Sequence, residues 1–310
     1  MTGTGALGAA IARLRVAGIS DASGDARRLL AHALAIAPDR LTLHLTERLS
    51  PDSQHRFEAA LIRRLARQPV SQIVGTRLFW GRAFTVTPAV LDPRPETECL
   101  IAEALRAPFV RVLDLGTGSG CILLTLLAER RGKASGLGVD LSSDALAIAR
   151  QNRLALQCDD CADLQQGSWY APVNQRFDLI VSNPPYVAAD EMAGLAPEVR
   201  DWEPRLALTP EGDGLDAYRA ISAGAQAHLA EGGRVIVEIG PTQAAAVAQM
   251  FHAAGFSDVV VGPDLDGRDR VLVARRQDQQ HCAGRKKSQK TRPIPPTDKN
   301  CLASTHRSRI

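Results

Sequence analysis

The chain has 310 residues, 45% hydrophobic and 23% charged, which is enough for two domains and a sizeable core. Its formal net charge of +3 is unevenly distributed along the chain. Residues 281–310 hold eight Lys or Arg and one Asp, a net charge of +7, so 3 minus 7 leaves a net charge of −4 for residues 1–280. This mildly acidic body argues against a protein that binds nucleic acid through a broad basic surface. Since no apolar run approaches about 20 residues, we expect no membrane-spanning helix.

Residues 1–6 have neither the basic nor the long apolar segment of a secretory signal. We therefore expect a cytoplasmic protein with its six cysteines reduced. Cys158 and Cys161 have the C-x-x-C spacing, but a zinc site needs two more ligands, and no second pair is near in sequence. We expect incidental thiols and no metal site.

Residues 1–71 are predicted to form a small bundle of helices. Apolar residues recur there at helical spacing, and Ser50-Pro51-Asp52 is a plausible start signal for the third helix. Asp25 stands where a carboxylate suits the first turn of a helix. Because the segment holds no obvious catalytic set, we expect either a substrate-recognition module or a packing accessory.

Residues 72–95 are predicted to form a β-hairpin linker, since residues 72–75 and 82–86 alternate in polarity around Gly81. The linker ends in a stiff segment with two prolines, and a helix is expected over residues 99–105. Thr97 or Glu96 would cap this helix at its start.

Arg94 and Glu96 have a second interpretation, as a wall at the mouth of an active site. The sequence leaves both interpretations open.

Residues 110–276 alternate between predicted strands and helices, which predicts a mostly parallel sheet with helices on both faces. Turn-forming residues at 264–269 predict that the last two strands pair as an antiparallel hairpin. The predicted strands cover residues 110–115, 137–140, 177–182, 233–239, 258–261 and 270–274, and helices are expected at 121–129 and 145–152.

A glycine loop follows the first of these strands, with the sequence Gly116-Thr117-Gly118-Ser119-Gly120. Strand, glycine loop and helix form a nucleotide-binding arrangement, although the spacing differs from the G-x-G-x-x-G of dinucleotide enzymes. Glycines let the backbone approach a ligand closely. Asp140 ends the next strand and is placed to bind ribose hydroxyls, while Asp114 can orient the loop or receive an ammonium group.

The stretch Asn183-Pro184-Pro185-Tyr186 ends the buried strand predicted at residues 177–182. Two prolines make the turn rigid, and the residue before a proline is held extended. The Asn183 side-chain oxygen and the Pro184 carbonyl can both accept from one NH2 group, and Tyr186 offers an aromatic face. The stretch therefore predicts a cradle for a planar amide or amino nitrogen.

The glycine loop, Asp140 and the Asn183 stretch together resemble the S-adenosylmethionine-binding fold of class I methyltransferases. The resemblance implies S-adenosyl-L-methionine as cofactor, with its sulfonium methyl as electrophile and the attacking nitrogen at Asn183. An in-line displacement needs mainly positioning. Acceptors at Asn183 and Pro184 favour positive charge on the nitrogen in the transition state, so no strong base is needed.

Asn-Pro-Pro-Tyr is shared by enzymes that methylate adenine, cytosine or guanine amino groups and by enzymes that methylate a glutamine amide, so the flanking sequence has to separate them. The flanks resemble the peptide chain release factor glutamine methyltransferase family (HemK-type) from about residue 7 to residue 276. The matching segments are residues 79–84, 93–98, 116–122, 203–208, 212–216, 238–240 and 267–270.

This resemblance implies methylation of the side-chain amide (N5) of the glutamine in the Gly-Gly-Gln motif of bacterial class 1 release factors. It also implies that Asn183 and Pro184 are catalytic, that residues 183–186 hold the glutamine, and that the cofactor is bound by Gly116, Thr117, Gly118, Ser119, Gly120, Asp140, Trp169 and Asn183. The sequence departs from the family pattern at Ser168, Asp92 and Gln72.

We therefore predict an α/β, Rossmann-like class I methyltransferase sheet at residues 96–276, preceded by the helical substrate-recognition bundle and followed by a basic, disordered tail at 277–310. The first alternative is a DNA or RNA amino-methyltransferase with the same site, which the acidic body disfavours. The second is a binding module without activity, which the intact glycine loop and Asn183 stretch disfavour.

Overall fold

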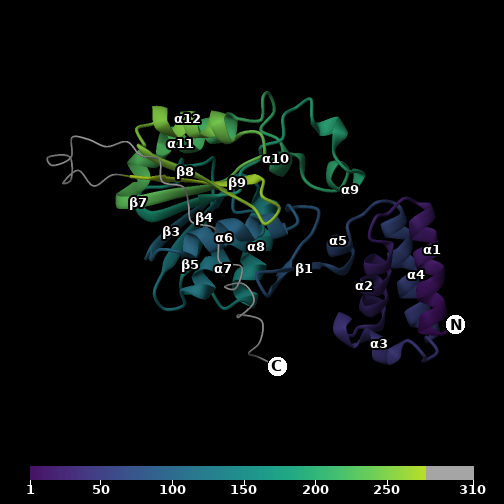
Figure 1. The fold of residues 1–310 in the computed structure, drawn as a ribbon. Coiled ribbons are helices and arrows are strands. Elements are labelled where there is room, and N and C mark those ends of the chain that lie inside the picture. Colours follow the sequence, from purple (N-terminus) through teal and green to yellow (C-terminus); the bar gives the residue numbers. More distant parts are fainter. Residues whose placement is uncertain (277–310) are drawn as a thin grey trace. The chain divides into compact units, whose positions relative to one another are not determined.

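The computed structural model describes residues 1–276, which contain a helical N-terminal segment and a seven-stranded mixed sheet flanked by helices (Figure 1). The basic tail predicted for residues 277–310 lies outside the described residues. Within the described range, no helix is both long and apolar enough to cross a membrane. The division of the chain into a bundle, a linker and a sheet domain at residues 71 and 95 stays a prediction.

The N-terminal segment is helical, as predicted, and its apolar stripes close on one core that includes Leu14 and Leu61. The start signal at Ser50 is confirmed, because its Oγ accepts from the backbone N–H of Ser53 at 3.1 Å. Asp25 lies in the first turn of its helix, as predicted. The elements are α1 (Gly3–Val16), α2 (Ala22–Leu34), η1 (Pro38–Arg40), α3 (Leu41–His44), α4 (Pro51–Leu65) and α5 (Val70–Val74).

The predicted hairpin is correct in its second part and wrong in its first. β1 (Thr76–Phe79) and β2 (Arg82–Thr85) pair antiparallel, but the preceding residues belong to helix α5. That helix ends at Gly75, whose φ of 79° is the left-handed conformation that often terminates helices. Ile73 packs into the bundle core, and a short run of four residues does not distinguish a helical turn from a strand.

The sheet has the order β5-β4-β3-β6-β7-β9-β8. Strands β3 to β7 are parallel to one another, whereas β9 is antiparallel to both β7 and β8. The predicted Rossmann-like sheet with a terminal hairpin is therefore confirmed. The strands are β3 (Arg111–Leu115), β4 (Ser135–Asp140), β5 (Ala162–Gln166), β6 (Phe177–Ser182), β7 (Leu229–Glu238), β8 (Asp258–Pro263) and β9 (Asp269–Arg275).

Strand β5 was not predicted. It lies at the edge of the sheet, and its sequence Ala-Asp-Leu-Gln-Gln has no apolar run and little β-branched content. Pairing with β4 at the edge of the sheet, and not its own composition, makes it a strand.

Helices cover both faces of the sheet (Figure 1). On one face, α6 and α7 share a core with the sheet that includes Leu123 and Val181. On the other, α11 and α12 pack around Tyr218 and Phe251. The remaining elements after β2 are η2 (Pro95–Thr97), α6 (Glu98–Leu105), α7 (Cys121–Glu129), α8 (Ser143–Ala155), η3 (Met192–Gly194), α9 (Pro197–Arg200), α10 (Arg205–Leu208), α11 (Asp216–His228) and α12 (Ala244–Ala253).

Candidate active site

A cavity of about 400 Å³ lies beyond the carboxyl ends of β3, β4 and β6. The chain moves outward from β3 through β4 and β5, then returns to place β6 on the other side of β3. Open α/β sheets bind ligands at such a reversal of strand order, because neighbouring strands send their loops in opposite directions there. The topology therefore places the glycine loop and the Asn183 stretch at one site.

The glycine loop joins β3 to α7 and leaves backbone open to the cavity. Gly116 and Gly118 have φ of 71° and 55°, and among the described residues nothing lies within 4 Å of a Cβ added to either. Beside them, Thr117 Oγ1 donates to Asp114 Oδ2 at 2.7 Å. This loop has the space and the backbone conformation that close approach of a ligand requires.

Asp114 is fully buried, and its Oδ1 has no hydrogen-bond partner within residues 1–276. Burial raises the pKa of this carboxyl to about 7, against the lowering effect of the Thr117 hydrogen bond. A buried acceptor without a donor is costly. Asp114 lies directly before the open loop, behind the residues that line the cavity.

Asp140 and Trp169 border the same cavity. Asp140 ends β4, and its carboxylate accepts from the backbone N–H groups of Gly118 at 2.8 Å and Ser142 at 2.9 Å. Burial raises the pKa of Asp140 although both hydrogen bonds oppose the rise. Trp169 follows β5 with a φ of 49° and packs partly against the core under α11 and α12. Asp140 thus also shapes the glycine loop itself.

Asn183 follows the last residue of β6, and its amide is oriented by Thr97. Asn183 Nδ2 donates to Thr97 Oγ1 at 3.1 Å, and Thr97 Oγ1 in turn donates to Glu238 Oε2 at 2.6 Å. This leaves Asn183 Oδ1 as the acceptor for a ligand. Thr97 is the N-cap residue of α6, as predicted, but its side chain makes no cap hydrogen bond and is engaged with Glu238 and Asn183 instead.

Glu238 ends β7 and is only 2% exposed. Ser182 pairs with Val237 in the parallel register, so the next residues, Asn183 and Glu238, are neighbours at the edge of the sheet. Burial raises the pKa of Glu238 to about 7, while the Thr97 hydrogen bond and the charge of Arg270 oppose the rise. A carboxyl group that titrates near neutral pH therefore lies one hydroxyl away from Asn183.

Most residues predicted for the site line the cavity, namely Gly116, Thr117, Gly118, Ser119, Asp140, Trp169, Asn183 and Pro185. Three others lie next to it: Gly120 precedes the first residue of α7, Pro184 is buried, and the Tyr186 carbonyl accepts from Gln243 Nε2 at 2.9 Å. Burial raises the pKa of the Tyr186 hydroxyl to about 12. Arg94 also lines the cavity, whereas Glu96 is exposed outside it.

Several parts of the lining were not recognised as part of the site from the sequence, and one of them is the stretch from residue 204 to residue 217. The backbone N–H of Val187 donates to the carbonyl of Leu208 at 3.0 Å, which ties this stretch to the Asn183 loop. The match of this stretch to the family pattern pointed to its importance. A sequence match alone does not show where a segment lies in the folded protein. The residues are Pro204, Leu206, Ala207, Thr209, Pro210, Asp216 and Ala217.

Within residues 1–276, no group of three or more His, Cys, Asp or Glu side chains is placed to hold a metal ion. The Sγ atoms of Cys158 and Cys161 each donate to a nearby backbone carbonyl at 3.6 Å. Asp213 and Asp216 both bind Arg219. These groups are accounted for by local contacts.

Comparison with known proteins shows the family to which the chain belongs. Residues 5–75 match the model of the PrmC N-terminal domain, and residues 95–198 match that of the methyltransferase small domain. A release factor glutamine methyltransferase of Cereibacter sphaeroides is 62% identical over 275 residues, which cover 89% of this chain and 99% of that protein. The chain belongs to the release factor glutamine methyltransferase family.

Other members are also similar along most of their length. The release factor glutamine methyltransferase of Rhodospirillum rubrum is 42% identical over 86% of this chain and 82% of its own. Among solved structures, a protein-(glutamine-N5) methyltransferase (release factor-specific) from Alicyclobacillus acidocaldarius is 33% identical, covers 63% of this chain and 99% of its own, and has a TM-score of 0.38. The identity to the two curated relatives over most of their length shows that the chain is an enzyme of the methyltransferase class.

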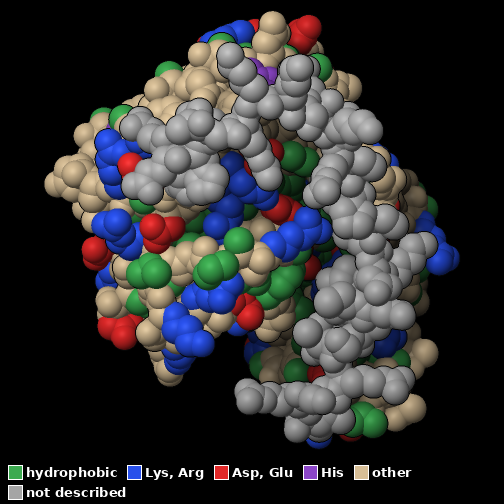
Figure 2. Space-filling view, turned by 60° about the vertical axis from the view of Figure 1, so that its left-hand side comes forward, with side chains coloured by type: hydrophobic (Ala, Val, Ile, Leu, Met, Phe, Trp, Pro, Cys, Tyr) green, Lys and Arg blue, Asp and Glu red, His purple; other side chains and the backbone are tan. Residues whose placement is uncertain are grey.

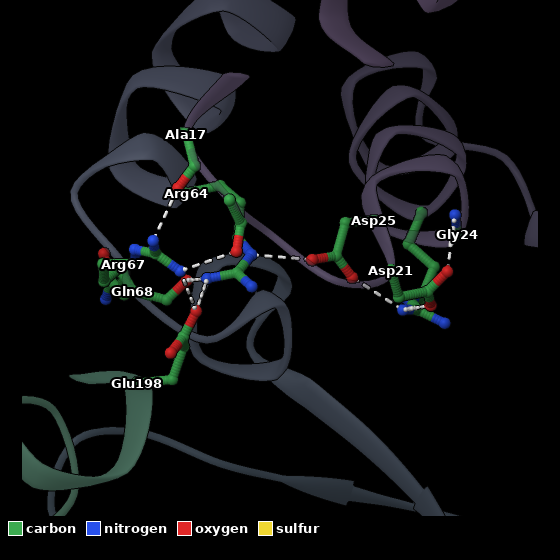
Figure 3. A network of polar contacts seen from close by, with 10 residues as sticks. Ala17, Asp21, Gly24, Asp25, Arg64, Arg67, Gln68 and Glu198 are labelled. Atoms are coloured by element: carbon green, nitrogen blue, oxygen red, sulfur yellow. Dashed lines mark hydrogen bonds and ion pairs between the residues drawn. The ribbon is translucent and has the colours of Figure 1, made fainter. Parts of the chain in front are cut away.

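In this member of the family, a buried ion network links the N-terminal helices to the loop after the Asn183 stretch (Figure 3). Arg64 of α4 is 7% exposed and donates through Nε to Asp25 Oδ2 at 2.7 Å. Its Nη1 reaches Glu198 Oε1, on α9, at 3.1 Å, and Arg67 binds the same oxygen at 3.2 Å. Gln72, a departure from the family pattern, adds a hydrogen bond to the Trp202 carbonyl at 2.9 Å.

Proposed function

We propose that this protein transfers a methyl group from S-adenosyl-L-methionine to the side-chain amide (N5) of the glutamine in the Gly-Gly-Gln motif of bacterial class 1 release factors. The observation that carries the proposal is the 62% identity, over nearly the whole length of both chains, to a release factor glutamine methyltransferase. A cytoplasmic location is part of the same proposal.

The cofactor proposal is supported by the fit of the residues present. Gly116 and Gly118 leave space for a ligand against their backbone, and the unpartnered Asp114 Oδ1 suits the ammonium group of the cofactor. Asp140 would bind ribose hydroxyls, and the indole of Trp169 would lie against adenine. When bound, S-adenosylmethionine supplies a methyl group activated by the positive sulfur that carries it.

The Asn183 stretch would hold the nucleophile. Asn183 Oδ1 and the Pro184 carbonyl would accept hydrogen bonds from the glutamine NH2 group. These two hydrogen bonds would aim the nitrogen lone pair, and the two oxygens would stabilise the positive charge that develops on the nitrogen. With the cofactor bound, the glutamine nitrogen would take the methyl group, the sulfur would keep the electron pair of the broken carbon–sulfur bond, and the nitrogen would give up one proton to solvent. Tyr186 would pack against the flat face of the amide.

A DNA or RNA amino group is the competing substrate, since it is also a planar NH2 group. The charge of −4 on residues 1–280 disfavours it. Figure 2 shows basic and acidic side chains interspersed on one face of the described residues, whereas phosphate binding favours a continuous basic surface.

The test is to incubate the full chain with methyl-labelled S-adenosylmethionine and, separately, with a class 1 release factor, the same factor with its Gly-Gly-Gln glutamine replaced, bulk DNA and bulk RNA. We expect label on the intact factor alone. Asn183→Ala should lower turnover roughly 100- to 1000-fold. Label on nucleic acid alone, or label on the factor that lacks the glutamine, contradicts the proposal.

A further inference from the structure

The orientation of the Asn183 amide decides what the site offers to a substrate. An asparagine side chain presents an acceptor from one side and two donors from the other, and a half-turn exchanges them. With the oxygen toward the cavity, Asn183 accepts from an NH2 group. With the nitrogen toward the cavity, it would set donor against donor and reject the same group. Something must therefore hold the amide in one of these two orientations.

The Thr97 hydroxyl and the Glu238 carboxylate supply that constraint. A hydroxyl has one proton to donate, and Thr97 uses it on Glu238 Oε2 at 2.6 Å. What remains toward Asn183 is a lone pair, which accepts from Nδ2 at 3.1 Å. Thr97 and Glu238 are both 2% exposed, so water does not readily replace either partner. An ionised carboxylate only accepts, and it thereby sets the direction of every hydrogen bond in the chain from Asn183 to Glu238.

We propose that Thr97 and Glu238 are positioning residues that hold the Asn183 amide with its oxygen toward the substrate nitrogen. This inference rests on the proposed function, since it explains how the cradle selects an NH2 group. It assigns a role to two residues that lie 141 positions apart in sequence and meet only in the folded protein.

The first test compares Thr97→Val, Thr97→Ser and Thr125→Val in the full chain. Thr97→Val keeps the shape and removes the hydroxyl, so kcat for release-factor methylation should fall roughly 10- to 100-fold while the Kd for cofactor stays within about twofold. Thr97→Ser restores the hydroxyl and should recover most of kcat. Thr125→Val is a matched control, because Thr125 is equally buried but its hydroxyl has no partner in the described part of the chain.

A second readout does not depend on activity. In the 15N-labelled protein, the Asn183 side-chain NH2 signal, assigned by its loss in Asn183→Ala, should exchange slowly with water. Exchange should become faster in Thr97→Val and stay unchanged in Thr125→Val. If the protein does not methylate a release factor, the proposed function fails while this measurement still tests the orientation. An Asn183 signal that does not respond to Thr97→Val, or a Thr97→Ser variant as slow as Thr97→Val, overturns the inference.

Glu238→Gln tests the charge that sets the direction. Protonated Glu238 can donate to Thr97, and Thr97 can then donate to Asn183 Oδ1 and favour the reversed amide. Wild-type kcat should therefore rise with pH between about 6 and 8, and this rise should be absent in Glu238→Gln. The same rise in both proteins would remove Glu238 from the mechanism.

Other groups face Glu238 from each element packed against it: Tyr186 after β6, Tyr218 of α11, Glu96 of η2, Cys99 of α6, Cys121 of α7 and Arg270 of β9. Burial raises the pKa of Tyr186 and Cys121 to about 12, and it also raises the pKa of Tyr218 and Cys99. These four stay neutral, and Arg270 stays charged, throughout the pH range of the test. The exposed Glu96 is the remaining acid, so Glu96→Gln is measured in parallel and should keep the pH dependence.

Discussion

Two of the buried carboxylates in this protein, Asp25 and Glu238, are compensated in different ways. Asp25, among the N-terminal helices, binds the guanidinium groups of Arg64 and Arg28 at 2.7 Å each. Glu238, beside Asn183, binds a hydroxyl, while the nearest guanidinium, Arg270, is itself bound to Asp264.

The comparison teaches how the partner decides the use of a buried acid. A buried carboxylate matched by two guanidinium groups contributes to structure, because removing one of them leaves the buried charge less well compensated. Burial raises the pKa of the Glu238 carboxyl group to about 7. Ionising Glu238 in the folded protein therefore costs free energy. Such a cost persists mainly where function needs the group. The contrast predicts opposite effects for substitutions in the two networks.

The largest effect is expected for Arg64→Met. It removes the buried one of the two guanidinium partners of Asp25, so the free energy of unfolding should fall by about 3–5 kcal/mol, measured by urea denaturation at pH 7. Arg13→Met, which breaks the exposed pair with Glu58, is the control and should cost less than about 1 kcal/mol. The double variant Asp25→Leu/Arg64→Met should recover most of the loss. Equal losses for Arg64→Met and Arg13→Met would break the comparison.

An intermediate effect of opposite sign is expected for Glu238→Gln. Because the folded pKa lies above the unfolded value, the native state binds more protons between about pH 4.5 and 7, and wild-type stability falls as pH rises through that window. Relative to wild type, Glu238→Gln should gain up to about 3 kcal/mol between pH 5 and pH 8. Urea midpoints at both pH values test this, and a constant difference between the two proteins would show that Glu238 does not titrate there.

The smallest effect is expected for Glu198→Gln. Glu198 binds Arg64 and Arg67, but its side chain is 23% exposed, so the loss should be about 0.5–1 kcal/mol. Burial alone would raise the pKa of Glu198. The hydrogen bonds from its own backbone and from the two arginines lower the pKa by more than burial raises it, so the pKa lies below its usual value. The stabilisation that Glu198 contributes is present above its pKa in the unfolded chain, and it is lost as the pH falls through its pKa in the folded protein. A difference from wild type that is larger at pH 4 than at pH 7 would contradict this sign.

Local patterns in the sequence were sufficient for much of the fold. Buried strands of a parallel sheet are apolar along their whole length, and therefore β3, β6 and β7 were visible as runs. The helix start at Ser50 was visible because a cap is made within four residues. Strand β5 and helix α5 were not predicted, because each segment is short enough to adopt either conformation. Pairing with β4 makes β5 a strand, and packing against the N-terminal core makes α5 a helix.

By itself, the sequence determined the family, the mixed sheet and the two short stretches that line one cavity, because each of these is written in neighbouring residues. The tertiary structure alone decided that the Thr97 side chain orients Asn183 instead of making a cap hydrogen bond, and that Glu238 lies behind it. It also decided that Arg64 compensates Asp25. These pairs are separated by 39 to 141 residues. Their hydrogen bonds arise from strand register and helix packing, which no local pattern encodes.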